Sequence, residues 1–310
     1  MQQDVLARLG FDSALLPKST VEIPRVLILD ADGAAYRACS SAKTLPTALR
    51  RFCTEVLEYQ FLTNSTDVRA HLTASGGFKG GRGLVQAFKP YQGNRAGKAK
   101  PALLEPLREL LGSPAAVDMG LPAEWFVCLN RYWEADDACT MDSYVLGDKG
   151  LVVSDDKDLR MTPYPYWEIS LGAASTIPNR FGYIRNADKT YPIGHGTKYF
   201  WLQMLMGDTA DNIRGLDRLD GRLCGQVGAI DFLSGVECEN EAANKVLWAY
   251  ARNGQDPLCE AQLLWMRRFQ EDCAYTYLME LDLDASLRTW LKQLHAYHIA
   301  IAGSTDETGD

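Results

Sequence analysis

Residues 26–38 read VLILDADGAAYRA, an apolar run that ends in two aspartates, a glycine and a Tyr-Arg pair. VLILD has the pattern of a parallel strand that is buried on both faces. Two chemistries fit the carboxylates that follow it. Asp30 could itself attack a phosphate, or it could hold a metal ion that lets water attack. The stretch alone leaves both chemistries open.

Outward from this strand, apolar runs and helical spacing alternate along the chain. The expected helices cover residues 47–62, 101–113 and 133–146, and the expected strands cover residues 68–74, 125–130 and 151–154. This alternation predicts an α/β fold with a central, mostly parallel twisted sheet flanked by helices. After about residue 195 the spacing becomes helical, which predicts a C-terminal helical region.

The expected organisation is an N-terminal extension, an α/β domain, a helical region and a polar tail, over residues 1–20, 21–200, 201–300 and 301–310 respectively. No apolar run approaches the roughly 20 residues that cross a bilayer, and the start lacks the blocks of a secretory signal. The eight cysteines are scattered without a CxxC pair. We therefore expect a cytoplasmic protein with free thiols, no membrane partner and no disulfide partner.

The net charge of −8 looks unsuited to nucleic acid, but the charges are unevenly distributed. Residues 68–104 contain seven Lys and Arg residues and no Asp or Glu. Within them, residues 75–101 are rich in glycine, as in a surface segment that becomes ordered on a ligand. One long basic stretch in an acidic chain indicates a phosphate-bearing substrate.

Carboxylates gather in four clusters at or near the ends of expected elements. The clusters are Asp30 with Asp32, Glu134 with Asp136 and Asp137, Asp155 with Asp156 and Asp158, and Asp208 with Asp211. Carboxylates packed at the ends of parallel strands repel one another unless cations neutralise them. Oxygen ligands suit Mg²⁺ or Mn²⁺, and two such ions can hydrolyse a phosphodiester without a protein nucleophile. Taken alone, EADD (134–137) also fits helix capping, and GDTADN (207–212) also fits a turn.

Five motifs follow one another along the chain: LILDADGAAYRA, YQGNR, EADD, VVSDDKDL and GDTADNIRG. With them, residues 25–235 resemble the 5′→3′ exonuclease and flap endonuclease superfamily, in its bacteriophage and DNA polymerase I-associated branch. The resemblance implies a PIN-like nuclease domain with a basic arch at about residues 75–101, followed by a helix–three-turn–helix region. It also implies a Mg²⁺-dependent 5′→3′ exonuclease or structure-specific 5′-flap nuclease that cuts DNA by a two-metal-ion mechanism. The phage-like branch implies a role in DNA replication in the host-cell cytoplasm.

The resemblance further implies cofactors, partners and site residues. The cofactors are two or more Mg²⁺ ions, for which Mn²⁺ substitutes. The partners are DNA with 5′ ends, flaps or single-strand/duplex junctions, and RNA–DNA hybrids. By position, the metal ligands are Asp30, Glu134, Asp136, Asp137, Asp156, Asp158, Asp208 and Asp211, with Asp32 and Asp155 as supporting neighbours. The catalytic basic residues are Arg37, Lys89 and Arg95. The residues expected on DNA are Phe78, Lys79, Arg82, Tyr91, Gln92, Lys98, Lys100, Lys198 and Arg214.

The chain departs from the family pattern in three places. Gln92 stands where the family's arch has a lysine. Residues 73–77 lack an aspartate that the family often has after its second strand. The loop over residues 215–229 is longer than the family's compact glycine turn and lacks its usual lysine.

Two other functions remain open. LILDADG also resembles the haloacid-dehalogenase-like phosphatases, in which Asp30 would be the nucleophile and Asp32 the general acid. In that family the late acidic motif follows a strand, whereas FWLQMLM (200–206) before Asp208 is expected to be a helix. The phosphatase family also has no use for EADD or for the basic segment. The departures leave open, in addition, a relative that binds DNA without cutting it.

Overall fold

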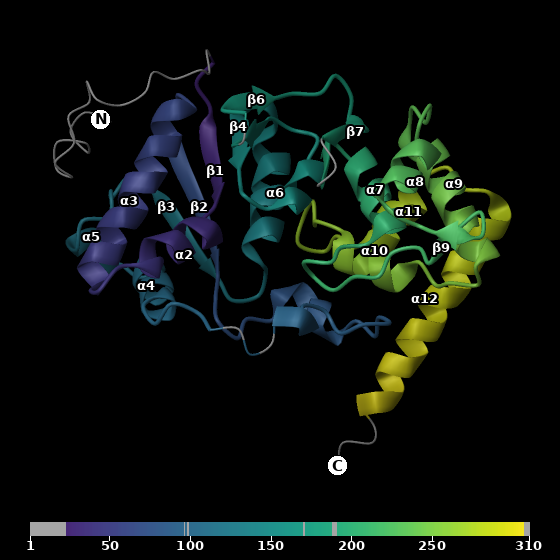
Figure 1. Cartoon of the computed structure of the whole chain (residues 1–310). Coiled ribbons are helices and arrows are strands. Elements are labelled where there is room, and N and C mark those ends of the chain that lie inside the picture. The colour runs from purple at the N-terminus through teal and green to yellow at the C-terminus, as the bar shows by residue number, and fades with distance from the viewer. Residues whose placement is uncertain (1–22, 96, 98, 170, 188–190, 307–310) are drawn as a thin grey trace. The chain divides into compact units, whose positions relative to one another are not determined.

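The computed structural model describes residues 23–95, 97, 99–169, 171–187 and 191–306 (Figure 1). The chain divides into two compact units. The N-terminal unit consists of Met1–Gly81 with Gly97–Arg180, and the C-terminal unit consists of Arg82–Ala96 with Phe181–Asp310. The predicted N-terminal extension at residues 1–20 lies outside the described residues.

The N-terminal unit is built around one sheet. Its strands are β1 (Val26–Asp30), β2 (Asp67–Thr73), β3 (Phe126–Asn130), β4 (Gly150–Val153), β5 (Tyr166–Glu168) and β6 (Ala173–Ser175). Within the described residues these six strands lie in the order β3-β2-β1-β4-β5-β6, with β6 antiparallel to β5 and every other pair parallel. The predicted α/β fold with a central, mostly parallel sheet is therefore confirmed.

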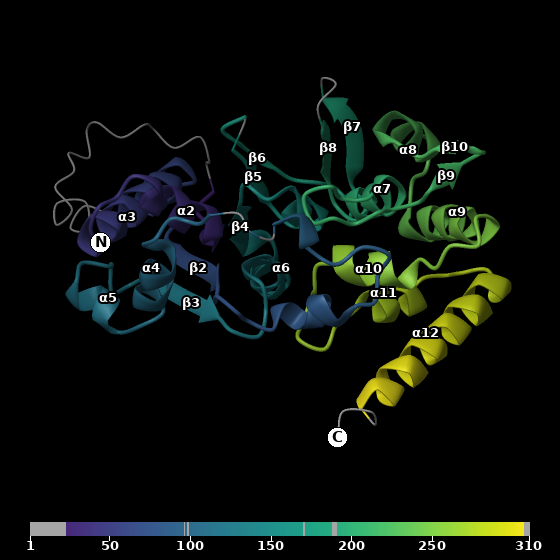
Figure 2. The same cartoon turned by 60° about the horizontal axis from the view of Figure 1, so that its bottom comes forward.

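Helices pack against both faces of this sheet (Figure 2). They are α2 (Asp32–Ser40), α3 (Leu45–Leu62), α4 (Leu104–Leu111), α5 (Ala115–Asp118) and α6 (Ala135–Leu146). Successive side chains of a strand point to opposite faces, so Leu27 and Leu29 of β1 pack with α2, α3 and α4, while Ile28 packs with Cys139 of α6. Burying each such β1 side chain contributes roughly 1.5–3 kcal/mol, which explains why the whole strand is apolar. Short 3₁₀ helices are η2 (Lys79–Leu84), η3 (Gly93–Arg95), η4 (Gly147–Lys149) and η5 (Lys157–Met161).

The C-terminal unit is mainly helical. Its helices are α7 (Lys198–Met206), α8 (Gln226–Phe232), α9 (Glu239–Arg252), α10 (Leu258–Leu264), α11 (Ala274–Glu280) and α12 (Ala285–Asp306). An antiparallel hairpin of β7 (Tyr183–Ala187) and β8 (Tyr191–His195) precedes them and contacts α7. The unit therefore begins before the predicted boundary near residue 200. Because α12 continues to Asp306, the start of the predicted polar tail is helical.

Helix α7 is the centre of the C-terminal core. All its residues from Tyr199 to Leu205 are buried. Trp265 stacks on Tyr277 with ring centroids 4.0 Å apart, and Phe200 of α7 meets Trp265 edge-on at 5.1 Å. A helix that is apolar on every side is a buried helix, which is why FWLQMLM lacks a clear helical stripe. The helix before Asp208 agrees with the nuclease resemblance and not with the strand that the phosphatase family has there.

The loop between α7 and α8 contains a small hairpin. Strands β9 (Arg218–Leu219) and β10 (Arg222–Leu223) pair antiparallel. Asp220 and Gly221, with φ of 49° and 77°, form the two-residue turn between them. The extra residues of the 215–229 loop are thus used for a hairpin between two helices.

Among the helices in the described part of the chain, none has the length and apolar content that crossing a bilayer needs. The eight cysteines are all free thiols, in agreement with their scattered spacing.

A largely buried ion pair links β2 to α6. His71 Nε2 lies 2.9 Å from Asp142 Oδ2, and Arg69 Nη1 lies 3.0 Å from Oδ1 of the same carboxylate. Burial alone would lower the pKa of His71, but hydrogen bonds, first of all to Asp142, raise that pKa above 6.5 overall. Burial alone would raise the pKa of Asp142, but the bond to His71 and the nearby positive charges lower it below 3.8 overall.

We expect the contribution of His71 to stability to depend on pH. A histidine whose pKa is raised on folding stabilises fully below its unfolded value of 6.5, and the effect is lost as pH rises through the folded value. His71→Gln should therefore lower the melting temperature more at about pH 5.5 than at about pH 9. In an Asp142→Asn background the larger loss at about pH 5.5 should disappear, because burial alone lowers the pKa of His71. If His71→Gln lowered the melting temperature of the wild-type protein equally at both pH values, the expectation would be contradicted.

Candidate active site

Asp30 lies at the carboxyl end of β1, beside the end of its parallel neighbour β4. Leu29 pairs with Val153, so Asp30 and Ser154 leave the sheet side by side. Ser154 Oγ donates a 2.7 Å hydrogen bond to Asp30 Oδ2, and the N–H of Asp32 donates to Oδ1 at 3.2 Å. Two adjacent parallel strands thus position this carboxylate where ligands of α/β sheets gather.

Asp156 and Asp158 follow β4 in a turn that is held by its own side chains. Ser154 Oγ accepts from the N–H of Asp156 at 2.8 Å, and Asp156 Oδ1 accepts from the N–H of Asp158 at 2.9 Å. Asp158 is 4% exposed, and its Oδ1 lies 2.9 Å from Lys157 Nζ. Ser154 therefore orients both Asp30 and Asp156.

The carboxylates at this edge are crowded enough to change their acidity. Burial, followed by the charge of Asp32, raises the pKa of Asp30 from 3.8 to about 6. Burial, followed by the charge of Asp158, raises the pKa of Asp156 from 3.8 to about 8, and Asp30 adds to this effect. Ionising these groups together at neutral pH requires a compensating positive charge. Mg²⁺ can supply it, because carboxylate oxygens are its preferred protein ligands.

The first turn of α6 carries three further predicted ligands. Glu134 directly precedes the helix, and Asp136 and Asp137 lie in its first turn. The N–H of Ala135 donates to Thr73 Oγ1 at 2.9 Å, so the end of β2 helps to cap α6. Glu134 and Asp137 are buried, at 6% and 0% exposure. Carboxylates that only cap a helix can stay exposed to solvent. The burial of Glu134 and Asp137 therefore goes beyond what capping requires.

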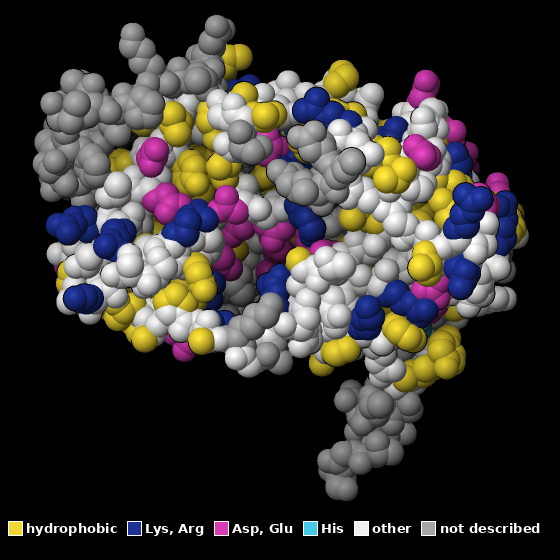
Figure 3. All heavy atoms as spheres, viewed as in Figure 1, with side chains coloured by type: hydrophobic (Ala, Val, Ile, Leu, Met, Phe, Trp, Pro, Cys, Tyr) yellow, Lys and Arg dark blue, Asp and Glu magenta, His cyan; other side chains and the backbone are white. Residues whose placement is uncertain are grey.

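The pKa of the buried Cys139 thiol in α6 is affected by carboxylates of two of the clusters. Burial raises its pKa well above the usual value, and the charges of Asp30 and Asp136 raise it further. Because charge effects fall with distance, the first turn of α6 lies near the end of β1. Figure 3 shows acidic side chains gathered over this part of the N-terminal unit. Asp30, Asp156 and Asp158 thus follow the neighbouring strands β1 and β4, and Glu134, Asp136 and Asp137 lie at the start of α6, which Thr73 joins to the end of β2.

The two carboxylates predicted as supporting neighbours are both bound by arginines. Asp32 Oδ1 accepts from Arg108 Nη2 at 2.7 Å and from the N–H of Thr73 at 3.1 Å. Asp155 pairs with Arg37. Asp32 thus ties β2 and α4 to the end of β1, which makes it a positioning residue.

Arg37 is held between two carboxylates at the same edge. Its Nε donates to Glu55 Oε1 at 3.0 Å, and its guanidinium also pairs with Asp155. A Cβ at Gly33 would lie 3.0 Å from Asp155 Oδ2 and 3.2 Å from Arg37 Nη1, so glycine leaves room for this pair. The Arg37 side chain remains 46% exposed. It therefore presents an oriented positive charge that solvent, or a phosphate, can reach.

The start of the predicted arch is fixed to the N-terminal unit. Phe78 packs on Tyr132 with ring centroids 4.8 Å apart, and the N–H of Gly80 donates to the Tyr132 carbonyl at 2.7 Å. Lys79 Nζ lies 3.1 Å from Glu134 Oε1. A lysine predicted on DNA thus contacts a predicted metal ligand.

Arg82, which the sequence predicts on DNA, is instead 2% exposed within the C-terminal unit. Its Nε donates to the carbonyl of Leu263 at 3.2 Å, and its Nη2 donates to that of Trp265 at 3.0 Å. These carbonyls lie at the end of α10, where a helix leaves its last carbonyls without helical partners. The burial rules out the predicted DNA contact, and Arg82 anchors the arch segment to α10.

Asp208 and Asp211 lie in a tight turn after α7 in the C-terminal unit. The N–H of Asp208 donates to the Ile213 carbonyl at 2.9 Å, and the N–H of Ile213 donates back at 2.7 Å. Asp208 Oδ1 accepts from the N–H of Ala210 at 2.8 Å. Both aspartates are buried, at 2% and 7% exposure. The turn that GDTADN indicates is therefore present, and it fixes two buried carboxylates.

Three residues of the YQGNR stretch converge on Asp211. Tyr91 Oη donates to Asp211 Oδ2 at 3.4 Å, and Gln92 Nε2 donates to Oδ1 at 3.2 Å. Arg95 pairs with the same carboxylate. The N–H of Gln92 also donates to the Asp211 carbonyl at 3.0 Å. This part of the arch is thus folded onto a predicted metal ligand of its own unit.

Two residues predicted on DNA have structural partners in the C-terminal unit. Lys198 Nζ donates to the Val236 carbonyl at 2.7 Å, and burial lowers the pKa of this lysine. The guanidinium of Arg214 lies 3.9 Å from the ring centroid of Phe88 and pairs with Asp217. By contrast, Lys89 and Lys100 are exposed, while Lys98 lies outside the described residues.

Two hydroxyl residues that position the carboxylates escape prediction from the sequence. Ser154 joins Asp30 to the turn after β4, and Thr73 caps α6 while its N–H binds Asp32. A serine or threonine next to the end of a strand is common in turns and caps of every kind. The only available signal was that each one directly adjoins a predicted acidic cluster or strand end.

Comparison with solved structures finds proteins that share the fold of this chain. The particular structures come from bacteriophage T5. The T5 D15 protein crystallised with metal ions aligns with a TM-score of 0.52 at 14% identity, over 83% of this chain and 91% of that one. T5 5′-exonuclease with bound zinc gives a TM-score of 0.48 at 14% identity, over 83% of this chain and 98% of that one. T5 D15 flap endonuclease in a complex with DNA and metal ions gives 0.43 at 13% identity, over 83% and 97%.

No protein-family model matches the sequence, and no curated protein sequence matches it. At 14% identity the structural likeness shows the fold. The predicted resemblance to the 5′-nuclease superfamily is confirmed at that level.

Proposed function

We propose that the chain is a metal-dependent 5′ nuclease that hydrolyses DNA phosphodiester bonds. The observation that carries this proposal is the crowding of Asp30 and Asp156 at the carboxyl ends of two neighbouring parallel strands. Their pKa values are raised to about 6 and about 8, so a nearby cation is needed before both carboxylates are fully ionised together at neutral pH. The fold shared with the T5 D15 protein, which was crystallised with metal ions, supports ion binding here.

The proposed cofactor is Mg²⁺, with Mn²⁺ as a substitute, because the donor set consists of oxygen alone. The ligands would be Asp30, Glu134, Asp136, Asp137, Asp156, Asp158, Asp208 and Asp211. When bound, two such ions supply a hydroxide near neutral pH and neutralise the charge that develops on the phosphate. The lysine that contacts Glu134 would have to move when that carboxylate binds an ion.

The basic residues of the chain would orient the strand to be cut. Arg37 is exposed and held by Glu55 and Asp155, so its guanidinium can bind a phosphate oxygen while Glu55 keeps it in place. Arg95 and Lys89 would bind further phosphates along the arch. Tyr91 would stack on a base, a contact that tolerates any sequence.

The proposed substrates are DNA 5′ ends, flaps and single-strand/duplex junctions, and RNA–DNA hybrids. Cutting would proceed as a 5′→3′ exonuclease, as a flap endonuclease, or both, and would serve DNA replication in a phage-infected cell. Because Lys and Arg contacts to phosphate release counterions, substrate binding should weaken steeply as salt rises.

The first test measures cleavage of a 5′-flap duplex that is labelled at its 3′ end. With Mg²⁺ the labelled strand should shorten from its 5′ side, and with EDTA it should stay intact. The product ladder separates exonuclease steps from a single cut at the junction. Binding of the flap without cleavage in Mg²⁺ or Mn²⁺ would show a DNA-binding relative and refute the nuclease proposal.

A phosphate-monoester substrate in the same assay tests the phosphatase alternative. That alternative needs Asp32 as a general acid, but Asp32 is bound by Arg108 and by the N–H of Thr73. We therefore expect no monoester hydrolysis above background. Hydrolysis of the monoester alone would favour the phosphatase.

A further inference from the structure

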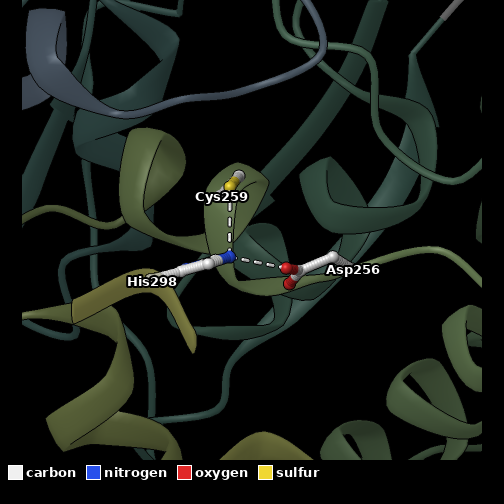
Figure 4. Close-up of side chains that lie close together, drawn as sticks. All are labelled: Asp256, Cys259 and His298. Atoms are coloured by element: carbon white, nitrogen blue, oxygen red, sulfur yellow. Dashed lines mark hydrogen bonds and ion pairs between the residues drawn. The ribbon is translucent and has the colours of Figure 1, made fainter. Parts of the chain in front are cut away.

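Three metal-binding side chains of the C-terminal unit point toward one another (Figure 4). His298 Nε2 lies 2.7 Å from Asp256 Oδ2 and 4.0 Å from Cys259 Sγ. One carboxylate oxygen, one imidazole nitrogen and the sulfur all lie within 4.8 Å of one another. The sequence alone does not indicate this cluster, because His298 is far from Asp256 and Cys259 in the chain.

Local structure fixes this arrangement from both sides. Asp256 Oδ1 accepts from the N–H of Leu258, the first residue of α10, at 2.8 Å, while Oδ2 faces His298. Asp256 lies just before α10 and Cys259 is the second residue of that helix, and a ligand atom from each of them lies within 4.8 Å of the ligand atom of His298. His298 comes from α12. The cluster therefore joins the start of α10 to the long C-terminal helix.

The donor set selects the kind of metal. Sulfur, imidazole nitrogen and carboxylate oxygen together suit Zn²⁺, whereas Mg²⁺ prefers oxygen alone. Tetrahedral Zn²⁺ with its usual bond lengths requires about 3.5 Å between nitrogen and sulfur and about 3.4 Å between nitrogen and oxygen. The corresponding distances here are 4.0 Å and 2.7 Å. Each of these two distances differs from its tetrahedral value by less than about 1 Å. A bound ion would replace the proton between His298 and Asp256 and the thiol proton that Cys259 donates to the Gln86 carbonyl, and both protons would pass to solvent.

We propose that Asp256, Cys259 and His298 form a Zn²⁺ site that fastens α12 to α10. A cavity of about 280 Å³ borders Cys259 and His298 and can hold a water as the fourth ligand. Nothing in this site depends on the acidic clusters of the proposed nuclease centre. The test of this zinc site is therefore independent of the test of the proposed nuclease function.

The test uses the full-length protein, stripped of metal by a chelator and then kept in excess Mg²⁺. Titration with Co²⁺, a spectroscopic substitute for Zn²⁺, should produce a sulfur-to-cobalt charge-transfer band and the visible bands of four-coordinate cobalt. The signal should saturate at one equivalent, and Zn²⁺ should abolish it. Cys259→Ser should remove the charge-transfer band, and His298→Gln should weaken Co²⁺ binding at least about tenfold.

Cys273→Ser is the matched control. Cys273 lines the same cavity but lies outside the cluster, and its sulfur accepts from the N–H of Thr276 at the start of α11. Serine can take over that cap, so this variant should keep the full cobalt spectrum. A wild-type protein without the charge-transfer band, or a band that survives in Cys259→Ser, would overturn the proposal.

Thiol labelling of the wild-type protein gives a second readout that does not depend on how a variant folds. Zn²⁺ should slow alkylation of Cys259 and leave the exposed Cys238 unchanged, as measured by mass spectrometry of the peptides. Equal labelling of Cys259 with and without Zn²⁺ would also overturn the site and leave an ordinary His298–Asp256 ion pair.

Discussion

Replacing Asp156 with asparagine is expected to lower the Mg²⁺-dependent cleavage rate more than about 100-fold, beyond the usual cost of losing a supporting partner of a metal site. Asparagine keeps an oxygen to accept the 2.9 Å bond from the N–H of Asp158, so the turn after β4 should survive. Asparagine lacks, however, the negative charge that binding of the metal ion requires. The measurement is single-turnover cleavage of the 3′-labelled flap at saturating Mg²⁺.

Thermal melting separates loss of metal binding from loss of fold. In EDTA the variant should melt at or above the wild-type temperature, because removing Asp156 removes a carboxylate whose pKa burial and Asp158 raise to about 8. Adding Mg²⁺ should raise the wild-type melting temperature more than that of the variant. Asp118→Asn, at an exposed carboxylate on α5, should change neither property. If the Asp156→Asn variant cleaved the flap at the wild-type rate, the proposed role of Asp156 as a metal ligand would be refuted.

Replacing Gly207 with alanine is expected to destabilise the C-terminal unit by about 3 kcal/mol or more. Gly207 ends α7 at φ +71° and ψ −174°, a conformation that is nearly restricted to glycine. A Cβ there would lie 2.4 Å from the Arg214 carbonyl oxygen and 2.5 Å from that of Ile213. These are backbone atoms of the turn that carries Asp208 and Asp211, so the turn itself would have to open.

Gly228→Ala is the control for Gly207→Ala. Gly228 lies inside α8, and no atom lies within 4 Å of a Cβ built there. Alanine should stabilise that helix by roughly 0.5–1 kcal/mol, the usual gain over glycine. Chemical denaturation of both variants measures the difference. A Gly207→Ala protein as stable as wild type would contradict the backbone contacts on which the expectation rests.

The sheet could be predicted because its central strands β1, β2 and β4 are largely buried. VLILD matches β1 at both ends, and the strand expected at 151–154 differs from β4 by one residue. The short strands β5 to β8 escaped prediction, because three to five residues with mixed polarity give no reliable period. Their existence depends on pairing with neighbours, which the local sequence does not contain.

The positions of the carboxylates could be predicted because they lie at or near the ends of helices and strands. The packing of the arch residues could not be predicted. Arg82 and Arg95 look alike in a basic, glycine-rich stretch. In the structure Arg82 binds carbonyls at the end of α10, and Arg95 pairs with Asp211, which lies over a hundred residues away in the chain. Long-range packing decides which arginine is structural and which stays near the surface.

The proposed ion at Asp211 would compete with residues of the arch for the same carboxylate oxygens. Its carboxylate accepts from Tyr91 and Gln92 and pairs with Arg95, so an ion that takes these oxygens must displace the guanidinium. Thermodynamic linkage is reciprocal, and whatever draws Arg95 away raises the affinity of Asp211 for the ion by the same factor. A DNA strand that captures Arg95 through its phosphate would thus help to load the last ion. If the proposed function holds, binding of the DNA strand would favour binding of the ion, and the pairing of Arg95 with Asp211 would oppose ion binding when no strand is present.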